Sequence, residues 1–121
     1  MPAERSRPLY LAIDQGGHAS RALVFDAHGA LLAKGLCEVQ VHHPQPDWVE
    51  QDPEEIVDSI NDAIHIALQD LGASAVNLVA AGLATQRSSI VCWDRLTGEA
   101  LSPVISWQDR RAREWLAHFS P

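Results

Sequence analysis

The chain has 121 residues, enough for one ordinary domain, and its composition of 46% hydrophobic and 21% charged residues is typical of a globular protein. The net charge of -7 argues against a nucleic-acid partner, because phosphate contacts need clustered lysine and arginine side chains. No apolar run approaches the ~20 residues of a membrane-spanning helix, and the N-terminus lacks the apolar segment of a signal peptide, so we expect no membrane association.

The two cysteines, Cys37 and Cys92, lie far apart and do not form the closely spaced pairs that bind metal ions. Both stand in apolar runs, which predicts buried free thiols. Because free thiols are typical of reducing compartments, we expect a cytoplasmic protein.

Residues 1–8 are expected to form a disordered leader, and apolar runs follow at residues 9–13, 20–25 and 31–41. The turns between these runs are short and contain glycine. Such a succession predicts an antiparallel β-meander.

The clearest helix boundaries in the chain follow this meander. Prolines within residues 44–51 exclude regular structure and predict a loop. Asp52 is then a good N-cap, Pro53 suits the first helical position, and Glu55 completes a pattern like a capping box. Gly72 is expected to end the helix. The core face of this helix is predicted from its apolar residues at helical spacing: Ile56, Ile60, Ala63, Ile64, Ala67, Leu68 and Leu71.

The remaining third of the chain predicts strands and a final helix. Residues 76–84 are almost entirely apolar, which predicts a strand buried on both faces. Residues 90–93 and 104–107 are expected to be further strands. Residues 109–118 predict a helix whose inward face carries Ala112, Trp115, Leu116 and Phe119. Together these elements predict an α/β sandwich.

The most informative polar residue in the first half is Asp14, which directly follows the first predicted strand. Gln15, Gly16 and Gly17 come next, and glycines let backbone N–H groups approach a phosphate. A carboxylate beside such a loop can hold Mg²⁺, directly or through water. The same residues also suit an ordinary hairpin turn, so the pattern alone leaves both interpretations open.

Two further polar segments follow predicted strands. The segment TQRSS contains Arg87, whose planar guanidinium suits a polyol or an anion. The segment SWQDRR contains Trp107, suited to form an apolar wall against a sugar ring or polyol, and Gln108 and Asp109, which can bond hydroxyl groups. The simpler interpretation is a loop with an incidental arginine, a tryptophan in the core, and Asp109 as a helix cap.

Together these segments resemble the N-terminal domain of the FGGY carbohydrate kinases, and among them the glycerol kinases. The similarity runs from residue 9 to residue 119, in the segments LAIDQGGHASRALVFD, HHPQPDWVEQDPEEI, AAGLATQRSSIVCWDRLTGEAL and VISWQDRRA. It implies an α/β fold of the ribonuclease H-like, actin-like ATPase type, with a mixed sheet, an antiparallel three-strand meander and flanking helices. Residues 9–121 are then the partial N-terminal domain.

The resemblance further implies an ATP-dependent kinase that uses Mg²⁺ to phosphorylate a hydroxyl of a small-molecule sugar or polyol. It places Asp14 beside the metal ion and the loop after it against the ATP phosphates. The residues implied on the nucleotide side are Asp14, Gln15, Gly16, Gly17, His18, Ser20 and Arg21. Those implied on the substrate side are Arg87, Ser88, Trp107, Gln108 and Asp109. No catalytic residue is expected in this chain, because the implied general base lies beyond Pro121.

The sequence departs from the glycerol kinases at two places. Gly17 and His18 stand where those enzymes have threonines, which removes hydroxyl contacts to phosphate. Ser88 stands where they have a glutamate that accepts hydrogen bonds from glycerol. A sugar or polyol other than glycerol is therefore the expected substrate.

The chain alone is expected to be inactive, because phosphoryl transfer needs metal, nucleotide and base in one water-poor cleft. Surfaces that the missing parts would cover are expected to promote self-association into homo-oligomers.

Two alternatives remain. A non-catalytic family member that binds a ligand or partner through a degenerate phosphate loop is motivated by His18 and Ser88. A metal-dependent nuclease of the same fold also needs an aspartate at the end of the first strand. It further needs carboxylates from the helix and the next strand, where this sequence has mostly isoleucine, alanine, threonine and glutamine.

Overall fold

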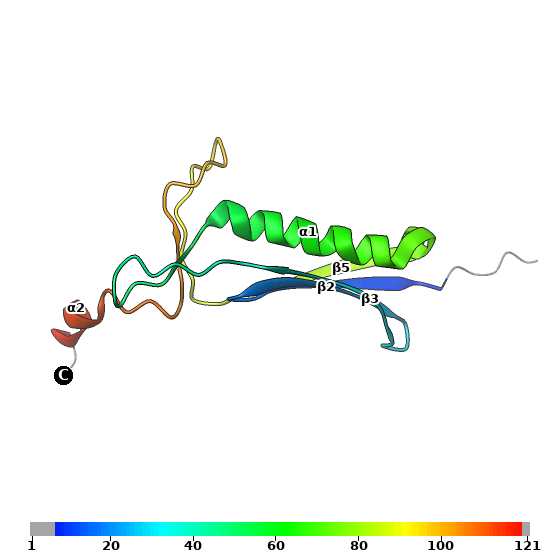
Figure 1. Ribbon diagram of the computed structural model, residues 1–121, viewed down its shortest axis with the longest axis horizontal. Helices are drawn as coiled ribbons and strands as arrows, with labels where there is room; N and C mark the ends of the chain where they lie inside the picture. Colours follow the sequence, from blue (N-terminus) through cyan, green and yellow to red (C-terminus); the bar gives the residue numbers. More distant parts are fainter. Residues whose placement is uncertain (1–6, 120–121) are drawn as a thin grey trace, which may run out of the picture.

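The computed structural model describes residues 7–119, so residues 1–6 of the predicted leader lie outside the described part. A four-stranded sheet and one long helix, α1, form the larger part of the molecule (Figure 1). β1 (Leu9–Gln15), β2 (Ala19–Asp26) and β3 (Leu31–Glu38) form an antiparallel meander, and β5 (Leu78–Thr85) pairs in parallel with β1. The strand order is β3-β2-β1-β5, which confirms the predicted meander and the mixed sheet.

α1 (Pro53–Leu71) begins where the sequence predicts. The carboxylate of the N-cap Asp52 accepts a hydrogen bond of 2.9 Å from the N–H of Glu54. The predicted capping box is wrong, because Oε1 of Glu55 accepts a 2.8 Å hydrogen bond from the N–H of Gln40. Glu55 therefore ties the segment after β3 to the start of the helix.

The end of α1 also agrees with the prediction. Gly72 follows the last helical residue with a φ of 63°, a conformation that glycine adopts without the strain of a Cβ atom. A short 3₁₀ helix, η1 (Gly72–Asn77), then leads into β5.

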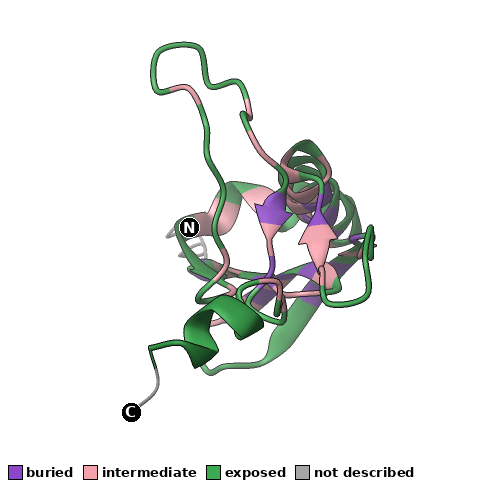
Figure 2. Cartoon of the chain, turned by 90° about the vertical axis from the view of Figure 1, so that its left-hand side faces the viewer, coloured by how far each residue is buried: buried purple, intermediate pink, exposed green. Residues whose placement is uncertain are grey.

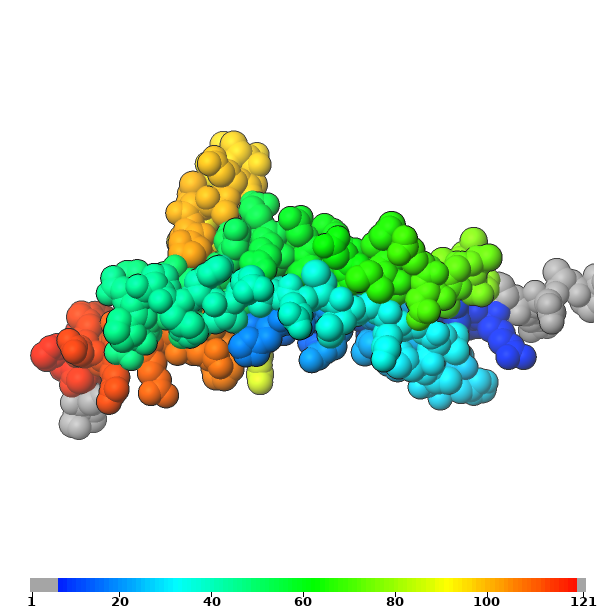
Figure 3. Space-filling view, viewed as in Figure 1, coloured from blue at the N-terminus to red at the C-terminus, as the bar shows by residue number. Residues whose placement is uncertain are grey.

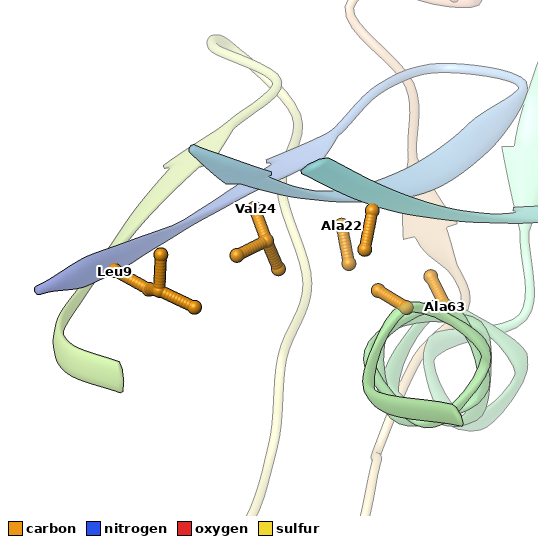
Figure 4. Packing of buried hydrophobic residues seen from close by; sticks show 6 residues of the cluster. Leu9, Ala22, Val24 and Ala63 are labelled. Carbon is orange, nitrogen blue, oxygen red and sulfur yellow. The ribbon is translucent and has the colours of Figure 1, made fainter. Parts of the chain in front are cut away.

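Small residues allow α1 to approach the sheet closely. Ala63 and Ala67 of α1 are fully buried, and a Cβ atom added to Gly35 of β3 would lie 1.9 Å from the carbonyl oxygen of Ala63. Figure 4 shows Ala63 pointing from α1 toward Ala22 of the sheet. The contact of helix and sheet is therefore built on residues with little or no side chain.

Only part of the predicted apolar stripe of α1 is buried against the sheet. The buried residues of α1 are Ser59, Ala63 and Ala67, whereas the larger Ile64 and Leu71 only pack against the edge of the core. Larger side chains do not fit at the centre, because the helix and sheet backbones lie so close there.

β5 contradicts the prediction of a strand buried on both faces. It is an edge strand whose residues are almost all exposed, with Val79 and Leu83 at 63% and 58% exposure. α1 packs mainly over β2 and β3, and among residues 7–119 β1 is the only strand that pairs with β5.

Residues 90–103 form an arm that projects away from the sheet (Figures 1 and 3). At its base, β6 (Val104–Ile105) pairs with β4 (Glu50–Gln51), and isolated bridges join Ile90 to Ile105 and Trp93 to Ala100. The predicted strand at residues 90–93 is thus reduced to single bridges, because no longer partner strand lies beside it.

α2 (Arg113–Ala117) is shorter than the predicted helix, and its N-cap is Ala112 rather than Asp109. The side chains predicted to face inward are exposed, as Figure 2 shows for the whole of this segment. None of the other helices and strands described in residues 7–119 packs over α2, which explains why the side chains of α2 are exposed. The four exposed residues that were predicted to face inward are Ala112, Trp115, Leu116 and Phe119.

The cysteines are free, as predicted, but not buried. Cys37 is half-buried on β3 and Cys92 is exposed on the arm. The apolar runs that carry them lie at a sheet edge and in the arm, where neither is fully covered. Within residues 7–119, no helix is both long enough and apolar enough to cross a membrane.

Candidate functional site

The turn between β1 and β2 places the first group of predicted site residues at one end of the sheet. β1 runs through Asp14 and Gln15, so Asp14 lies inside the strand rather than after it. The N–H of Gly16 donates to the carbonyl of Ala19 over 2.9 Å and closes the turn. The buried side chain of Gln15 donates to the carbonyl of Gly16 over 2.7 Å, so it supports the turn from inside.

Asp14 and Arg21 are cross-strand partners, and their side chains form an ion pair of 3.0 Å. Both side chains are 52% exposed, so solvent screening leaves the pair little stabilising effect and both charges accessible. They lie on the sheet face opposite α1, because their strand neighbours Gln15 and Ser20 are buried on the helix side.

This arrangement suits Mg²⁺, which commonly takes one or two protein carboxylates and completes its shell with water and phosphate oxygens. Among residues 7–119, His, Cys, Asp and Glu side chains nowhere gather in threes able to hold a metal ion. The predicted metal site therefore depends on Asp14 alone.

Ser20 does not lie where the resemblance implied. It is fully buried, and its hydroxyl forms a 2.7 Å hydrogen bond with the hydroxyl of Ser59 on α1. Ser59 also donates to the carbonyl of Ile56 over 2.7 Å. Ser20 therefore joins sheet to helix and is not available to a phosphate, in contrast to the exposed His18 in the turn.

A second group of predicted residues forms a pocket of about 550 Å³ just beyond β5. Within the described residues it is lined by Gln86, Arg87, Ser88 and Trp107. The N–H of Gln86 donates to the carbonyl of Gln15 over 2.9 Å, which sets this pocket beside the end of β1. Asp14 itself does not line the pocket.

The pocket wall has an unusual backbone at Ser88, whose φ is 63°. Residues other than glycine seldom adopt this conformation, and it costs on the order of 1–3 kcal/mol. Such strained residues cluster at ligand sites, and Ser88 is flanked by the exposed Arg87 in the same wall.

Asp109 belongs to a separate cluster. Its Oδ2 accepts from the N–H of Val49 over 2.7 Å, and both its oxygens accept from the Arg111 side chain over 2.8 Å. Arg111 also pairs with Glu50 over 2.7 Å and stacks over the ring of Trp48, with its Cζ 3.9 Å from the ring centre. The side chain of Asp109 is only 4% exposed, so its oxygens are not open to a substrate.

The donors of Arg111 and the N–H of Val49 lower the pKa of Asp109 to about 2. The same contacts, first among them that with Asp109, raise the pKa of Arg111. The contact of Asp109 with Arg111 thus favours the charged form of both groups, and the cluster of Trp48, Glu50, Asp109 and Arg111 holds residues 47–51 against the segment after β6. We call it the clasp.

Gln108 is exposed, and its N–H donates to the hydroxyl of Ser106 over 3.3 Å, but its side chain does not line the pocket. The structure therefore brings together Arg87, Ser88 and Trp107, and separates Gln108 and Asp109 from them.

The sequence did not single out Gln51, Gln86 or Ser89 as site residues. Gln51 bonds to the turn, Gln86 lines the pocket, and Ser89 bonds to the pocket wall. The sequence gives no sign that Gln51 is buried. A polar side chain directly before a helix cap usually faces solvent, but that of Gln51 is 1% exposed.

Comparisons with known proteins agree on one family. The sequence profile of the FGGY family of carbohydrate kinases, N-terminal domain, matches residues 9–121. The glycerol kinase of Aromatoleum aromaticum is 46% identical over 101 residues, which is 84% of this chain and 20% of that protein. The chain thus spans about a fifth of the length of the curated relatives it matches.

Solved structures give the same fold. The crystal structure of Plasmodium falciparum glycerol kinase with ADP superposes with a TM-score of 0.82 at 24% identity, over 94% of this chain and 23% of that one. The xylulose kinase of Rhodospirillum rubrum gives 0.85 at 20% identity, over 92% and 22%. These likenesses confirm the predicted actin-like, ribonuclease H-like fold, and the profile match shows that the chain belongs to the FGGY family of carbohydrate kinases.

Proposed function

We propose that the chain is the N-terminal part of an ATP-dependent kinase that phosphorylates a hydroxyl of a sugar or polyol. The observation that carries the proposal is the pocket of Arg87, Ser88 and Trp107 beside the end of β1. Arg87 offers several hydrogen-bond donors to hydroxyl groups, and the exposed face of Trp107 offers an apolar surface to the carbon chain of a sugar or polyol.

The turn and Asp14 form the nucleotide side of the proposed site. Asp14 would hold Mg²⁺, which when bound to a nucleotide neutralises charge on its phosphates. Arg21 pairs with Asp14 and adds a second, exposed group for an anion. The backbone of Gly16, Gly17 and His18 completes this side, while Gln15 supports it from within.

Arg87, Ser88 and Trp107 form the substrate side. In this proposal Arg87 donates to substrate hydroxyls, and Trp107, 57% exposed, forms the apolar wall. A serine at position 88 offers a short donor and acceptor in place of a carboxylate, so we propose a substrate other than glycerol.

The chain alone is proposed to be inactive, since it spans about a fifth of the relatives' length and phosphoryl transfer needs metal, nucleotide and base together in one water-poor cleft. Purified residues 1–121 should release no ADP above background with glycerol or xylulose in a coupled assay. Phosphate transfer by this chain alone would contradict this part of the proposal.

The kinase proposal is tested by grafting residues 9–119 in place of the matching segment of the A. aromaticum glycerol kinase. We expect the chimera to phosphorylate at least one sugar or polyol in a panel that includes xylulose. Arg87→Ala should lower its kcat/KM about 100-fold, since a charged hydrogen bond to substrate is lost. Arg95→Ala, at an exposed position of the arm, is the matched control and should change nothing.

The substrate proposal has its own test in the same chimera. Gly17→Thr with Ser88→Glu introduces the groups found in glycerol kinases, and should raise kcat/KM for glycerol about tenfold or more. A Cβ at position 17 meets nothing closer than Oε1 of Gln86 at 3.9 Å, so there is room for the Cβ of the introduced threonine. Unchanged glycerol use would overturn the role given to these positions.

The second candidate is a non-catalytic family member that binds a ligand or partner. It is favoured by Gly17 and His18, which provide no side-chain hydroxyl in the turn. A chimera that is folded but inactive on the whole panel, while the parent enzyme remains active, would support this candidate over the kinase.

The remaining parts of the proposal concern setting and assembly. We propose a cytoplasmic location, which suits the free thiols of Cys37 and Cys92, with neither nucleic acid nor membrane as a partner. Homo-oligomerisation through the exposed apolar strand β5 is also proposed.

A further inference from the structure

A continuous chain of hydrogen bonds joins the turn after β1 to the wall of the Arg87 pocket. The N–H of Trp107 donates to the hydroxyl of Ser89 over 3.2 Å, and this hydroxyl donates to Oε1 of Gln86 over 3.2 Å. The amide of Gln86 donates to Oε1 of Gln51 over 3.0 Å, and the amide of Gln51 donates to the carbonyl of Gly17 over 2.9 Å. We call this series the relay.

Every bond of the relay points the same way, from Trp107 toward Gly17. Dipoles aligned head to tail polarise one another, so such a series is stronger than its separate bonds. The direction also fixes both amides: turning either one would set two donors or two acceptors against each other. The relay therefore has one satisfied arrangement.

Burial makes that arrangement costly to break. Gln51 is 1% exposed, and Gln86 and Ser89 are partly buried, so water does not readily replace a missing partner at the centre. Among residues 7–119, no buried side-chain nitrogen or oxygen lacks a partner. Loss of one member would leave both its neighbours unsatisfied.

We infer that Gln51, Gln86 and Ser89 are positioning residues that set the turn and the pocket wall as one unit. In the proposed kinase, on which the functional part of this inference rests, the ends of the relay are the nucleotide side and the substrate side. A ligand that fixes Trp107 would thereby restrict Gly17, and a nucleotide that fixes the turn would restrict the pocket wall. None of the relay side chains needs to touch the reacting atoms.

The first test needs no ligand and uses the 121-residue chain. Amide hydrogen exchange followed by NMR should show the Trp107 N–H exchanging about tenfold faster in Gln51→Leu than in the parent chain, although Gln51 bonds neither Trp107 nor Ser89. The amide of Ala67 in α1 reports global stability and should keep its protection. An unchanged Trp107 rate would overturn the relay.

Ser89→Ala removes a relay member at the opposite end and tests the same coupling. It replaces Gln51→Leu if that variant fails to fold. The side-chain amide protons of Gln51 should then exchange faster. Ser89→Thr keeps a hydroxyl and should restore the parent rate, which a general loss of packing would not predict. Gln69→Leu is the matched control, because Gln69 bonds only His65 on the exposed side of α1 and should leave both ends unchanged.

A second arm separates this inference from the proposed function. Xylulose and glycerol are added in turn. Xylulose should shift the NMR signals of Trp107 and Gly17 together in the parent chain, and of Trp107 alone in Ser89→Ala, whereas glycerol should shift them less. If Trp107 shifts without Gly17 in the parent chain, the coupling is wrong. If neither compound shifts any signal, the substrate proposal is weakened, while the exchange test still decides the relay.

Discussion

Gly35 is the residue on which the contact of helix and sheet most directly depends. Its missing side chain lets β3 lie against the backbone of α1, so that a Cβ atom would lie 2.9 Å from the N of Ala67 and closer still to the carbonyl of Ala63. These are backbone atoms of a regular helix, which cannot move away like the end of a flexible side chain. Any side chain at this position therefore forces α1 and β3 apart.

Gly35→Ala should lower the free energy of unfolding by about 2–3 kcal/mol, because α1 must shift away from the sheet. Urea denaturation measures the change. Gly82→Ala in β5 is the control: a Cβ there meets nothing within 4 Å, so its effect should stay within about 0.5 kcal/mol. Equal stabilities of the two variants would show that the close approach is absent in solution.

Asp109 gives a second prediction for a single residue, through its pKa of about 2. Because this pKa is below the value of ~3.9 expected in the unfolded chain, Asp109 stabilises the fold fully above about pH 4. The contribution should be lost as the pH falls from about 4 to about 2. The difference in unfolding free energy between the parent chain and Asp109→Asn should therefore shrink over that range.

Urea titrations at pH 7, 4, 3 and 2 would follow this difference. Asn61→Ala, which replaces an uncharged residue on the exposed side of α1, is the control, and its difference from the parent chain should not change with pH. A difference between parent and Asp109→Asn that stays constant down to pH 2 would mean that the clasp does not depend on the charge of Asp109.

Among the elements, α1 has the clearest local determinants. Asp52→Ala should lower the free energy of unfolding by about 1 kcal/mol, because the N–H of Glu54 loses its acceptor, whereas Asp52→Asn should preserve most of it. Thermal unfolding followed by circular dichroism would compare the two. Equal losses would show that charge, and not the cap hydrogen bond, is what matters at this position.

The elements also show how much the sequence could predict. Strands β1 to β3 and both ends of α1 follow from local signals: short apolar runs, turn glycines, an aspartate cap and a terminal glycine. The position of Arg87 and Trp107 in one pocket followed from a family resemblance. The bond of Ser20 to Ser59 and the two bonds of the Gln51 side chain join residues 34 to 39 positions apart, and no local rule specifies such partners.

Exposure was the property that sequence predicted least well. An apolar run such as β5 or a helix face such as that of α2 indicates that something should cover it, but not whether the covering segment is within the same 121 residues. The run at residues 78–85 is apolar and is nevertheless an exposed edge strand among residues 7–119.

At the scale of the whole molecule, β5 presents an apolar edge with one side unpaired among residues 7–119. Such an edge is a template for pairing with another chain. The chain should therefore self-associate with rising concentration in sedimentation velocity runs, and Leu83→Lys should reduce the effect by placing a charge on that edge.

Leu96→Lys is the control for this prediction. Leu96 is 92% exposed on the arm, so the same substitution there should leave self-association unchanged. A sedimentation coefficient of the parent chain that does not change on dilution would contradict the prediction.

The left-handed backbone of Ser88 restricts which residues can replace it in the wall of the proposed substrate pocket. Short residues such as asparagine, aspartate and glycine adopt a φ of 63° most readily, whereas valine, isoleucine and threonine are strongly disfavoured there. Natural selection can therefore vary the polarity of this wall in single steps, but it cannot easily fill the pocket with a branched aliphatic group. In a library of all substitutions at position 88 that is selected for folded protein, the small polar variants should be recovered and the branched ones should be lost.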